Sequence, residues 1–171
     1  MSASIFFIVG NIDQSTVASL IKFRSDLLNA NPAPSKLTIL ISSLGGDVGA
    51  AIASYNIIKS IDHLPIETHN IGEVTSAANI IYLAADTRLT CAKSYFRHHG
   101  TFYQSNGNLH RVAYEDILET MKTGEKIMTD IIVERTRLTA EDVAKYFRSP
   151  LTINADEALR LGIATAIEEI A

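Results

Sequence analysis

The sequence contains one cysteine and no tryptophan, and only 4 of its 171 residues are proline. Because Cys91 is alone, no internal disulfide can form, and nothing indicates a thiol framework built for an oxidising compartment. Cys91 lies in an apolar stretch, where a buried thiol usually serves as a small hydrophobic residue. We therefore expect a cytoplasmic protein in which Cys91 is structural and not a nucleophile.

Basic clusters and long apolar runs are lacking as well. The chain has 15 Lys and Arg against 19 Asp and Glu, a formal net charge of −4, which argues against a general phosphate-binding surface. The apolar run near the N-terminus, Ile5 to Val9, is far too short for a signal-peptide core or a membrane span. We expect no nucleic-acid partner and no membrane association.

Short β-branched runs alternate along the chain with longer stretches of helical period. This alternation is typical of βα units around a largely buried sheet, and the length suits one domain. We therefore predict an α/β protein with a single domain over residues 1–171. The predicted strands are Ile5–Val9, Lys36–Ser42, Ile66–Ile71, Arg88–Ala92 and Tyr95–His98.

Helical periodicity predicts four helices of more than one turn: Ser15–Leu28, Val48–Ile61, Ser76–Ala85 and Val112–Arg135. The last is long for a domain of this size. Periodicity alone leaves open whether it projects from the domain or lies across its own core. Two capping motifs, beginning at Thr139 and at Asn154, predict short helices near the C-terminus.

A pair of adjacent glycines follows the second predicted strand, in Ser42-Ser-Leu-Gly-Gly-Asp-Val48. Glycines allow a sharp turn that leaves backbone N–H groups free to face a ligand, as in a phosphate loop or an oxyanion hole. A phosphate loop is a weak interpretation, because neither the Walker pattern nor the dinucleotide fingerprint occurs. A plain strand-to-helix turn explains the glycines equally well.

A serine and two histidines follow neighbouring predicted strands. Ser76 opens a buried helix, with its hydroxyl at the positive end of the helix and near the N–H of Ala77. Taken alone, Ser76 is best explained as a simple N-cap. His98 and His99 follow the next strands, however, and an imidazole can accept the proton of a serine nucleophile. Spacing alone makes this a weak signal.

Several segments resemble the ClpP peptidase family, and together they span about Ile5 to Ile167. They are Ser43-Leu-Gly-Gly-Asp-Val48 with Ala50, Ala51 and Tyr55, Ile71-Gly-x-x-x-Ser76 with Leu83-Ala-Ala85, Arg88 to His99, and Asn154-Ala-Asp-Glu-Ala158 with Leu161-Gly162. The resemblance implies a ClpP/crotonase-like fold of repeated β-β-α units, with a projecting handle helix over about residues 110–136. It also implies a homo-oligomeric ring and no metal or organic cofactor.

The resemblance further implies the chemistry of a serine endopeptidase that acts on small or unfolded polypeptides through an acyl-enzyme. It places the nucleophile at Ser76, the general base at His99, and the oxyanion hole at the backbone N–H groups of Gly46 and Ala77. Counting without gaps from Arg88 favours His99 over His98, although a shift of one residue would reverse them. Neighbours in a strand point to opposite faces, so only one of the two can reach Ser76.

The sequence departs from the family at two places. The family's catalytic aspartate falls on Pro150, which has no side-chain acceptor, so the third triad member is unknown. Ser149 or Thr152 would orient the imidazole less well, and Asp142 and Asp156 are better explained as helix-capping acids. The family's N-terminal segment, which meets an unfoldase, has no counterpart before the first strand, so the resemblance does not extend to coupling with an ATPase.

Three functions remain open. The first is a serine peptidase of low activity. The second is a catalytically impaired subunit with a structural or regulatory role in an oligomer, which both departures favour. The third is a crotonase-type enzyme acting on acyl-CoA, since that class shares the broader fold and also uses paired backbone N–H groups. The match at Ser76 and His99 argues against the third.

Overall fold

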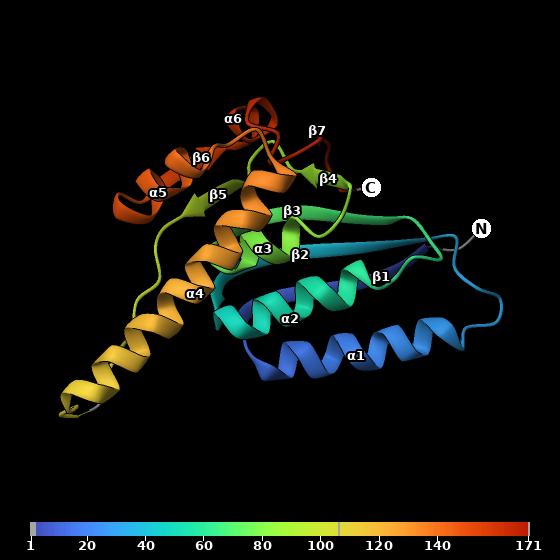
Figure 1. Cartoon of the computed structure of the whole chain (residues 1–171). Helices are drawn as coiled ribbons and strands as arrows, with labels where there is room; N and C mark the ends of the chain where they lie inside the picture. Colours follow the sequence, from blue (N-terminus) through green and yellow to red (C-terminus); the bar gives the residue numbers. More distant parts are fainter. Residues whose placement is uncertain (1–2, 106, 171) are drawn as a thin grey trace.

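A mostly parallel sheet forms the centre of the chain, with helices packed along it (Figure 1). The computed structural model describes residues 3–105 and 107–170. The strands are β1 (Ala3–Ile12), β2 (Lys36–Gly46), β3 (Ile66–Thr75), β4 (Thr87–Thr90), β5 (Tyr95–His98), β6 (Leu151–Asn154) and β7 (Ala166–Ile167). The helices are α1 (Gln14–Leu28), α2 (Val48–Lys59), α3 (Ala78–Tyr82), α4 (Arg111–Arg135), α5 (Ala140–Arg148) and α6 (Ala155–Arg160). The α/β class predicted from the sequence is confirmed.

The sheet divides at β3. The strands pair in the order β1-β2-β3-β4-β7, all parallel, and β5 pairs with β3 outside this path. The first half of β3 pairs with β4, whereas its last residues, Glu73–Thr75, pair with Tyr95–Arg97 of β5. Strand β6 then runs antiparallel to β5. The division brings the end of β5, where the two histidines lie, beside the end of β3, where Ser76 follows.

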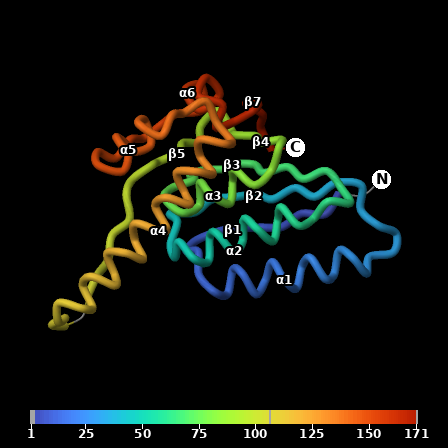
Figure 2. Tube along the Cα trace, viewed as in Figure 1, coloured from blue at the N-terminus to red at the C-terminus, as the bar shows by residue number. Residues whose placement is uncertain are grey.

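Apolar side chains from the strands and from α1, α2 and α3 form the core. Helices α1 and α2 lie side by side along the sheet, and α3 lies close to β3 (Figure 2). Every residue of α3 is buried, and the Tyr82 ring meets the Phe96 ring of β5 edge to face, with centroids 5.0 Å apart. Helix α3 is therefore fixed between the sheet and helices α2 and α4, and so is the turn that precedes it.

One local expectation is wrong, two strands were not expected, and two expectations hold. The predicted helix Ser76–Ala85 is shorter, because Ser76 adopts a left-handed backbone and α3 begins only at Ala78. Strands β6 and β7 are not among the predicted strands. The two capping motifs form as predicted: the Asp142 N–H donates to the Thr139 hydroxyl, and the Glu157 N–H donates to the Asn154 side chain.

Helix α4 projects from the body of the molecule at its N-terminal end and packs against it at its C-terminal end (Figure 1). Its buried residues, Met128, Ile131 and Ile132, all lie in the last third, whereas Tyr114 and Leu118 are more than half exposed. The two alternatives left open by its periodicity therefore apply to different halves of one helix. No helix in the described part of the chain is long and apolar enough to cross a membrane.

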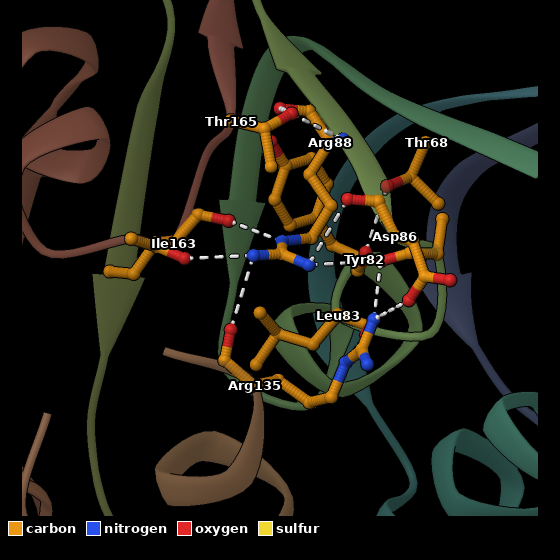
Figure 3. Close-up of polar contacts among 10 residues, drawn as sticks. Thr68, Tyr82, Leu83, Asp86, Arg88, Arg135, Ile163 and Thr165 are labelled. Carbon is orange, nitrogen blue, oxygen red and sulfur yellow. Dashed lines mark hydrogen bonds and ion pairs between the residues drawn. The ribbon is translucent and has the colours of Figure 1, made fainter. Parts of the chain in front are cut away.

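A buried arginine ties the C-terminal segments to the core (Figure 3). The Arg88 side chain, 7% exposed, donates only to backbone carbonyls, and burial lowers the pKa of its guanidinium. Its acceptors come from the α3–β4 turn, the end of α4 and the segment before β7; they are Ala85, Asp86, Arg135, Gly162 and Ile163. The rigid five-donor fork of arginine suits this role.

Replacing Arg88 by methionine is expected to lower the free energy of unfolding by about 3 kcal/mol or more, because several buried carbonyls lose their donors at once. The Arg88→Lys variant should recover little, since a single ammonium cannot reproduce the fork. Urea denaturation measures both. The exposed Arg111→Met change, which removes one surface ion pair with Glu115, is the control and should cost about 0.5 kcal/mol at most. An Arg88→Met variant as stable as this control would contradict the assignment.

Candidate active site

Ser76 occupies a strained turn between β3 and α3. Its φ is +56°, in the left-handed region that non-glycine residues rarely adopt. The Ser76 N–H donates to the Arg97 carbonyl of β5 at 2.9 Å, and no side-chain cap of α3 is formed. Strain of this kind persists only where the surroundings enforce it, and it concentrates at functional sites. Ser76 is therefore not the simple N-cap that its position in the sequence favours.

Asn79 holds the Ser76 turn against the strand that leads to the histidines. Its side chain is 1% exposed, and Nδ2 donates to the Ser76 carbonyl at 2.9 Å and to the Arg97 carbonyl at 3.0 Å. One amide group thus joins the turn after β3 to the end of β5. This bridge fixes the position of Ser76 relative to the residues that follow Arg97.

The two glycines after β2 allow that strand to approach the serine turn. Gly45 has φ +93°, and a Cβ built on it would lie 2.7 Å from the Ser76 Cβ and 3.0 Å from the Ala77 nitrogen. Gly46 has φ +151°, and a Cβ there would overlap the Ile12 carbonyl oxygen. Only glycine suits either position. The pair therefore permits close contact between backbones, as an oxyanion hole needs.

Ser76, His99 and Gly46 line one small cavity of about 160 Å³, together with Val48, Thr101, Phe102 and Met128. Ala77 follows Ser76 in the chain, and its N–H donates no hydrogen bond to any described residue. A free backbone N–H next to a half-buried serine is the arrangement that stabilises a developing oxyanion. The structure thus brings Ser76, Gly46, Ala77 and His99 together from three separate segments.

The two histidines differ sharply in environment. His98 is 4% exposed, packs near the Tyr146 ring, and has no hydrogen-bond partner at Nε2 among the described residues. Burial, followed by the nearby His99, lowers the pKa of His98 to about 4. His99 is half-buried and lines the cavity, with the Phe102 ring stacked beside it at 6.2 Å between centroids. Only His99 shares the cavity with Ser76.

The imidazole of His99 is oriented by a backbone carbonyl. Its Nδ1 lies 2.7 Å from the Gly100 oxygen, and because a carbonyl can only accept, Nδ1 must carry the proton. The lone pair therefore resides on Nε2. Among the described residues, no hydrogen bond joins the Ser76 hydroxyl to either histidine. Catalytic hydrogen bonds are often long before substrate binds.

Pro150, where the sequence predicts the family's aspartate, lies near His99 but has no side-chain acceptor for its imidazole. Pro150 and His99 line a shallow hollow of about 410 Å³, with the exposed Arg97 and Arg148 at its edge. The Asp142 side chain instead caps α5, where hydrogen bonds from Thr139 lower the pKa of its carboxyl. In the described part of the chain, Ser149, Thr152 and Asp156 likewise form no hydrogen bond with His99.

An apolar groove extends from the cavity between the start of α2 and the middle of α4. It encloses about 380 Å³ and shares Gly46, Val48, Thr101 and Phe102 with the Ser76 cavity, continuing past Ile52, Met121 and Ile127. Gly124 lets the helices approach, since a Cβ there would meet the Val48 side chain at 3.2 Å. The groove is large enough for one apolar side chain next to the serine.

A metal site and a cysteine nucleophile have less support than the serine site. The described residues include no group of three or more His, Cys, Asp or Glu that could hold a metal ion. Cys91 lies 3.5 Å from the Nε2 of His69, but that nitrogen also bonds the Glu168 carbonyl at 2.9 Å, so its proton points there. Burial raises the pKa of the Cys91 thiol, which opposes a nucleophilic role.

Sequence reasoning missed four residues around the site: Asn79, Gly100, Thr101 and Glu125. Asn79 carried a usable signal, as the only polar side chain within an otherwise apolar run. Gly100 acts through its carbonyl, which every residue type has. Glu125 reads as an ordinary surface charge on a long helix, and no local pattern connects it with a loop 24 residues earlier.

Comparison with known proteins agrees with this fold. The structure is similar to that of a point mutant of ClpP1 from Listeria monocytogenes, with a TM-score of 0.79 and 24% identity over 97% of this chain and 91% of that one. ClpP1 from the same organism aligns with a TM-score of 0.75 and 22% identity over 98% and 92% of the two chains. No curated protein shows significant similarity. The model of the Clp protease family matches residues 1–171, so the chain belongs to the Clp protease family and has the ClpP-like fold.

Proposed function

We propose that the protein is a serine peptidase that cleaves small or unfolded polypeptides, with Ser76 as nucleophile and His99 as general base. The observation that carries the proposal is the shared cavity. A strained serine and an imidazole with its lone pair on Nε2 both border the same 160 Å³ space, and the residue after the serine, Ala77, has a backbone N–H that donates no hydrogen bond to any described residue. Membership of the Clp protease family supports peptide chemistry over the acyl-CoA alternative.

The reaction follows from these positions. The Ser76 Oγ attacks the peptide carbonyl carbon while its proton passes to the Nε2 of His99. The negative oxygen that forms accepts hydrogen bonds from the N–H groups of Ala77 and Gly46. As the C–N bond breaks, Nε2 returns the proton to the leaving amine, which leaves an acyl ester on Ser76. Water, deprotonated by the same nitrogen, then releases the acid.

The groove between α2 and α4 supports a preference in the substrate. Its lining near the cavity is mostly apolar and includes Val48, Phe102 and Met121. An extended polypeptide with its carbonyl beside Ser76 would place one neighbouring side chain in this groove, where burial of an apolar group is favourable. We therefore infer cleavage next to apolar residues. A homo-oligomer is also part of the proposal, because the projecting half of α4 exposes Val112, Tyr114 and Leu118.

A fluorophosphonate probe tests the nucleophile directly. Intact-protein mass spectrometry should show one adduct per chain in the wild type and none in the Ser76→Ala variant, because only an activated serine reacts with the probe. The exposed Ser149→Ala change is the matched control and should label like the wild type. A wild-type protein that stays unlabelled after many hours at high probe concentration would contradict the proposal and favour a catalytically impaired subunit.

A further inference from the structure

The peptide group between Gly100 and Thr101 is bonded at both ends. Its carbonyl oxygen, on Gly100, accepts from the Nδ1 of His99 at 2.7 Å. Its N–H, on Thr101, donates to the Oε1 of Glu125 at 2.9 Å. These two atoms belong to one planar, resonance-coupled unit. A continuous chain of hydrogen bonds therefore runs from the imidazole, through one peptide group, to a carboxylate on α4.

The carboxylate of Glu125 forms its hydrogen bonds with Thr101, in the loop that follows His99. The same oxygen, Oε1, also accepts from the Thr101 hydroxyl at 2.8 Å. No lysine, arginine or histidine in the described part of the chain forms an ion pair with Glu125. Its negative charge is thus directed at Thr101 and is not neutralised by a neighbouring cation. Glu125 is also only partly exposed, so water screens it less than the surface acids of α4.

The loop is built to keep this peptide in place. The Gly100 N–H donates to the Phe147 carbonyl of α5 at 3.2 Å, and a Cβ on Gly100 would lie 2.7 Å from that oxygen. Gly100 therefore lies against α5 on one side, while Glu125 of α4 holds Thr101 on the other. Two helices fix a loop that would otherwise be free to turn its carbonyl away from His99.

We propose that Glu125 is the positioning residue for His99 and acts through the Gly100–Thr101 peptide in place of a directly bonded triad acid. The proposal rests on the serine-peptidase function proposed above. Hydrogen bonds in a chain polarise one another: a carboxylate that accepts from the N–H draws electron density onto the carbonyl oxygen. That oxygen becomes a stronger acceptor for Nδ1–H, which secures the tautomer.

The effect is largest when the imidazole is charged. As the Ser76 proton reaches Nε2, positive charge spreads over the ring to Nδ1–H, which faces the polarised Gly100 oxygen. No proton leaves Nδ1, and Glu125 touches neither the substrate nor a reacting atom. It stabilises the imidazolium through one intervening peptide, more weakly than a carboxylate in direct contact would.

The Glu125→Gln variant separates charge from geometry. The Gln amide oxygen can still accept both hydrogen bonds from Thr101, so the loop keeps its anchor while the negative charge is removed. We expect kcat for an activated ester to fall about tenfold with KM unchanged. The Nδ1 proton resonance of His99 in the ¹H NMR spectrum should move upfield, because its hydrogen bond weakens. The thermal midpoint should change little.

Two further variants complete the test. Glu119→Gln makes the same chemical change at an exposed position of α4 and should leave kcat and the Nδ1 resonance as in the wild type. Thr101→Val removes the hydroxyl but keeps the N–H that forms the chain, and should leave the Nδ1 resonance of His99 close to its wild-type position; because Thr101 lines the Ser76 cavity, this resonance and not kcat is the readout for this variant. A shift of the resonance in Thr101→Val as large as that in Glu125→Gln would show that the hydroxyl, and not the peptide, is what Glu125 needs.

The outcomes distinguish this inference from the proposed function. If the wild type is labelled at Ser76 by the fluorophosphonate and Glu125→Gln matches it in kcat and in the Nδ1 resonance, the inference is wrong and the peptidase proposal stands. If the wild type is never labelled, the peptidase proposal fails. The Nδ1 resonance then still reports whether Glu125 orients the imidazole, because that readout needs no turnover.

Discussion

Replacing either Ser76 or His99 by alanine is expected to lower the hydrolysis of an activated ester by at least about a thousandfold. Members of a serine–histidine pair act as a unit, so loss of either one removes the nucleophilic route, and the residual rate comes from the oxyanion hole and binding alone. The double variant should be no slower than the single ones. Steady-state kinetics with a chromogenic ester measure all three proteins.

The His98→Ala variant is the matched control. His98 is buried on the side away from the cavity, so its loss should leave most of the ester activity. A reversed pattern, with activity lost in His98→Ala and kept in His99→Ala, would move the base to His98. Equal loss in both would indicate that the damage is to folding, which circular dichroism of the two variants would reveal.

The same variant has a second readout in its pH dependence. The pKa of His98 is about 4 in the folded protein against about 6.5 unfolded. Between these two pH values His98 is protonated in the unfolded chain but neutral in the folded chain. The free energy of unfolding therefore decreases as the pH falls from about 6.5 towards 4, by up to about 3 kcal/mol. Urea titrations over this range should show a shallower pH slope for His98→Ala than for the wild type.

The features that the sequence predicts well are the ones encoded by local patterns. Alternating β-branched runs and helical periods identify the sheet and its helices, and the capping motifs at Thr139 and Asn154 form as expected. The glycine pair was predicted as either an oxyanion hole or a plain turn. The structure adds the positive φ of both glycines and their contact with the Ser76 turn, which supports the first.

The features that the sequence conceals depend on contacts between distant segments. Strand β6 pairs only with β5, more than 50 residues earlier, and its four residues carry no strong pattern. The left-handed φ of Ser76 is imposed by contacts with Arg97 and Asn79. The Nδ1 partner of His99 is a backbone carbonyl, so a search for a side-chain acid near Pro150 could not find it.

Peptide hydrolysis by the wild type is expected to be slow even though an activated ester acylates Ser76 at a measurable rate. In chymotrypsin-type proteases the aspartate fixes the imidazole tautomer and stabilises the imidazolium, and its replacement lowers turnover about ten-thousand-fold. Here the Gly100 carbonyl fixes the tautomer, but as a neutral group it stabilises the imidazolium less than a carboxylate in direct contact. The Gly100 carbonyl therefore replaces the aspartate in fixing the tautomer, but only in part in stabilising the imidazolium.

An activated ester and a peptide differ in how strongly their cleavage depends on stabilisation of the imidazolium. An activated ester leaves without a proton, whereas an amide leaves only when Nε2 delivers one, so its breakdown depends on a well-stabilised imidazolium. We therefore expect the ratio of ester to peptide kcat/KM, measured on substrates with the same acyl group, to exceed that of an intact triad by about a thousandfold or more. The Glu125→Gln variant should widen this ratio further, because it weakens the same stabilisation.

Peptide turnover by the wild type in the ordinary range of about 1–1000 per second would contradict the prediction. A carboxylate would then have to reach His99 from elsewhere, and the hollow that His99 and Pro150 share with Arg97 and Arg148 is where one from a second copy of the chain would bind.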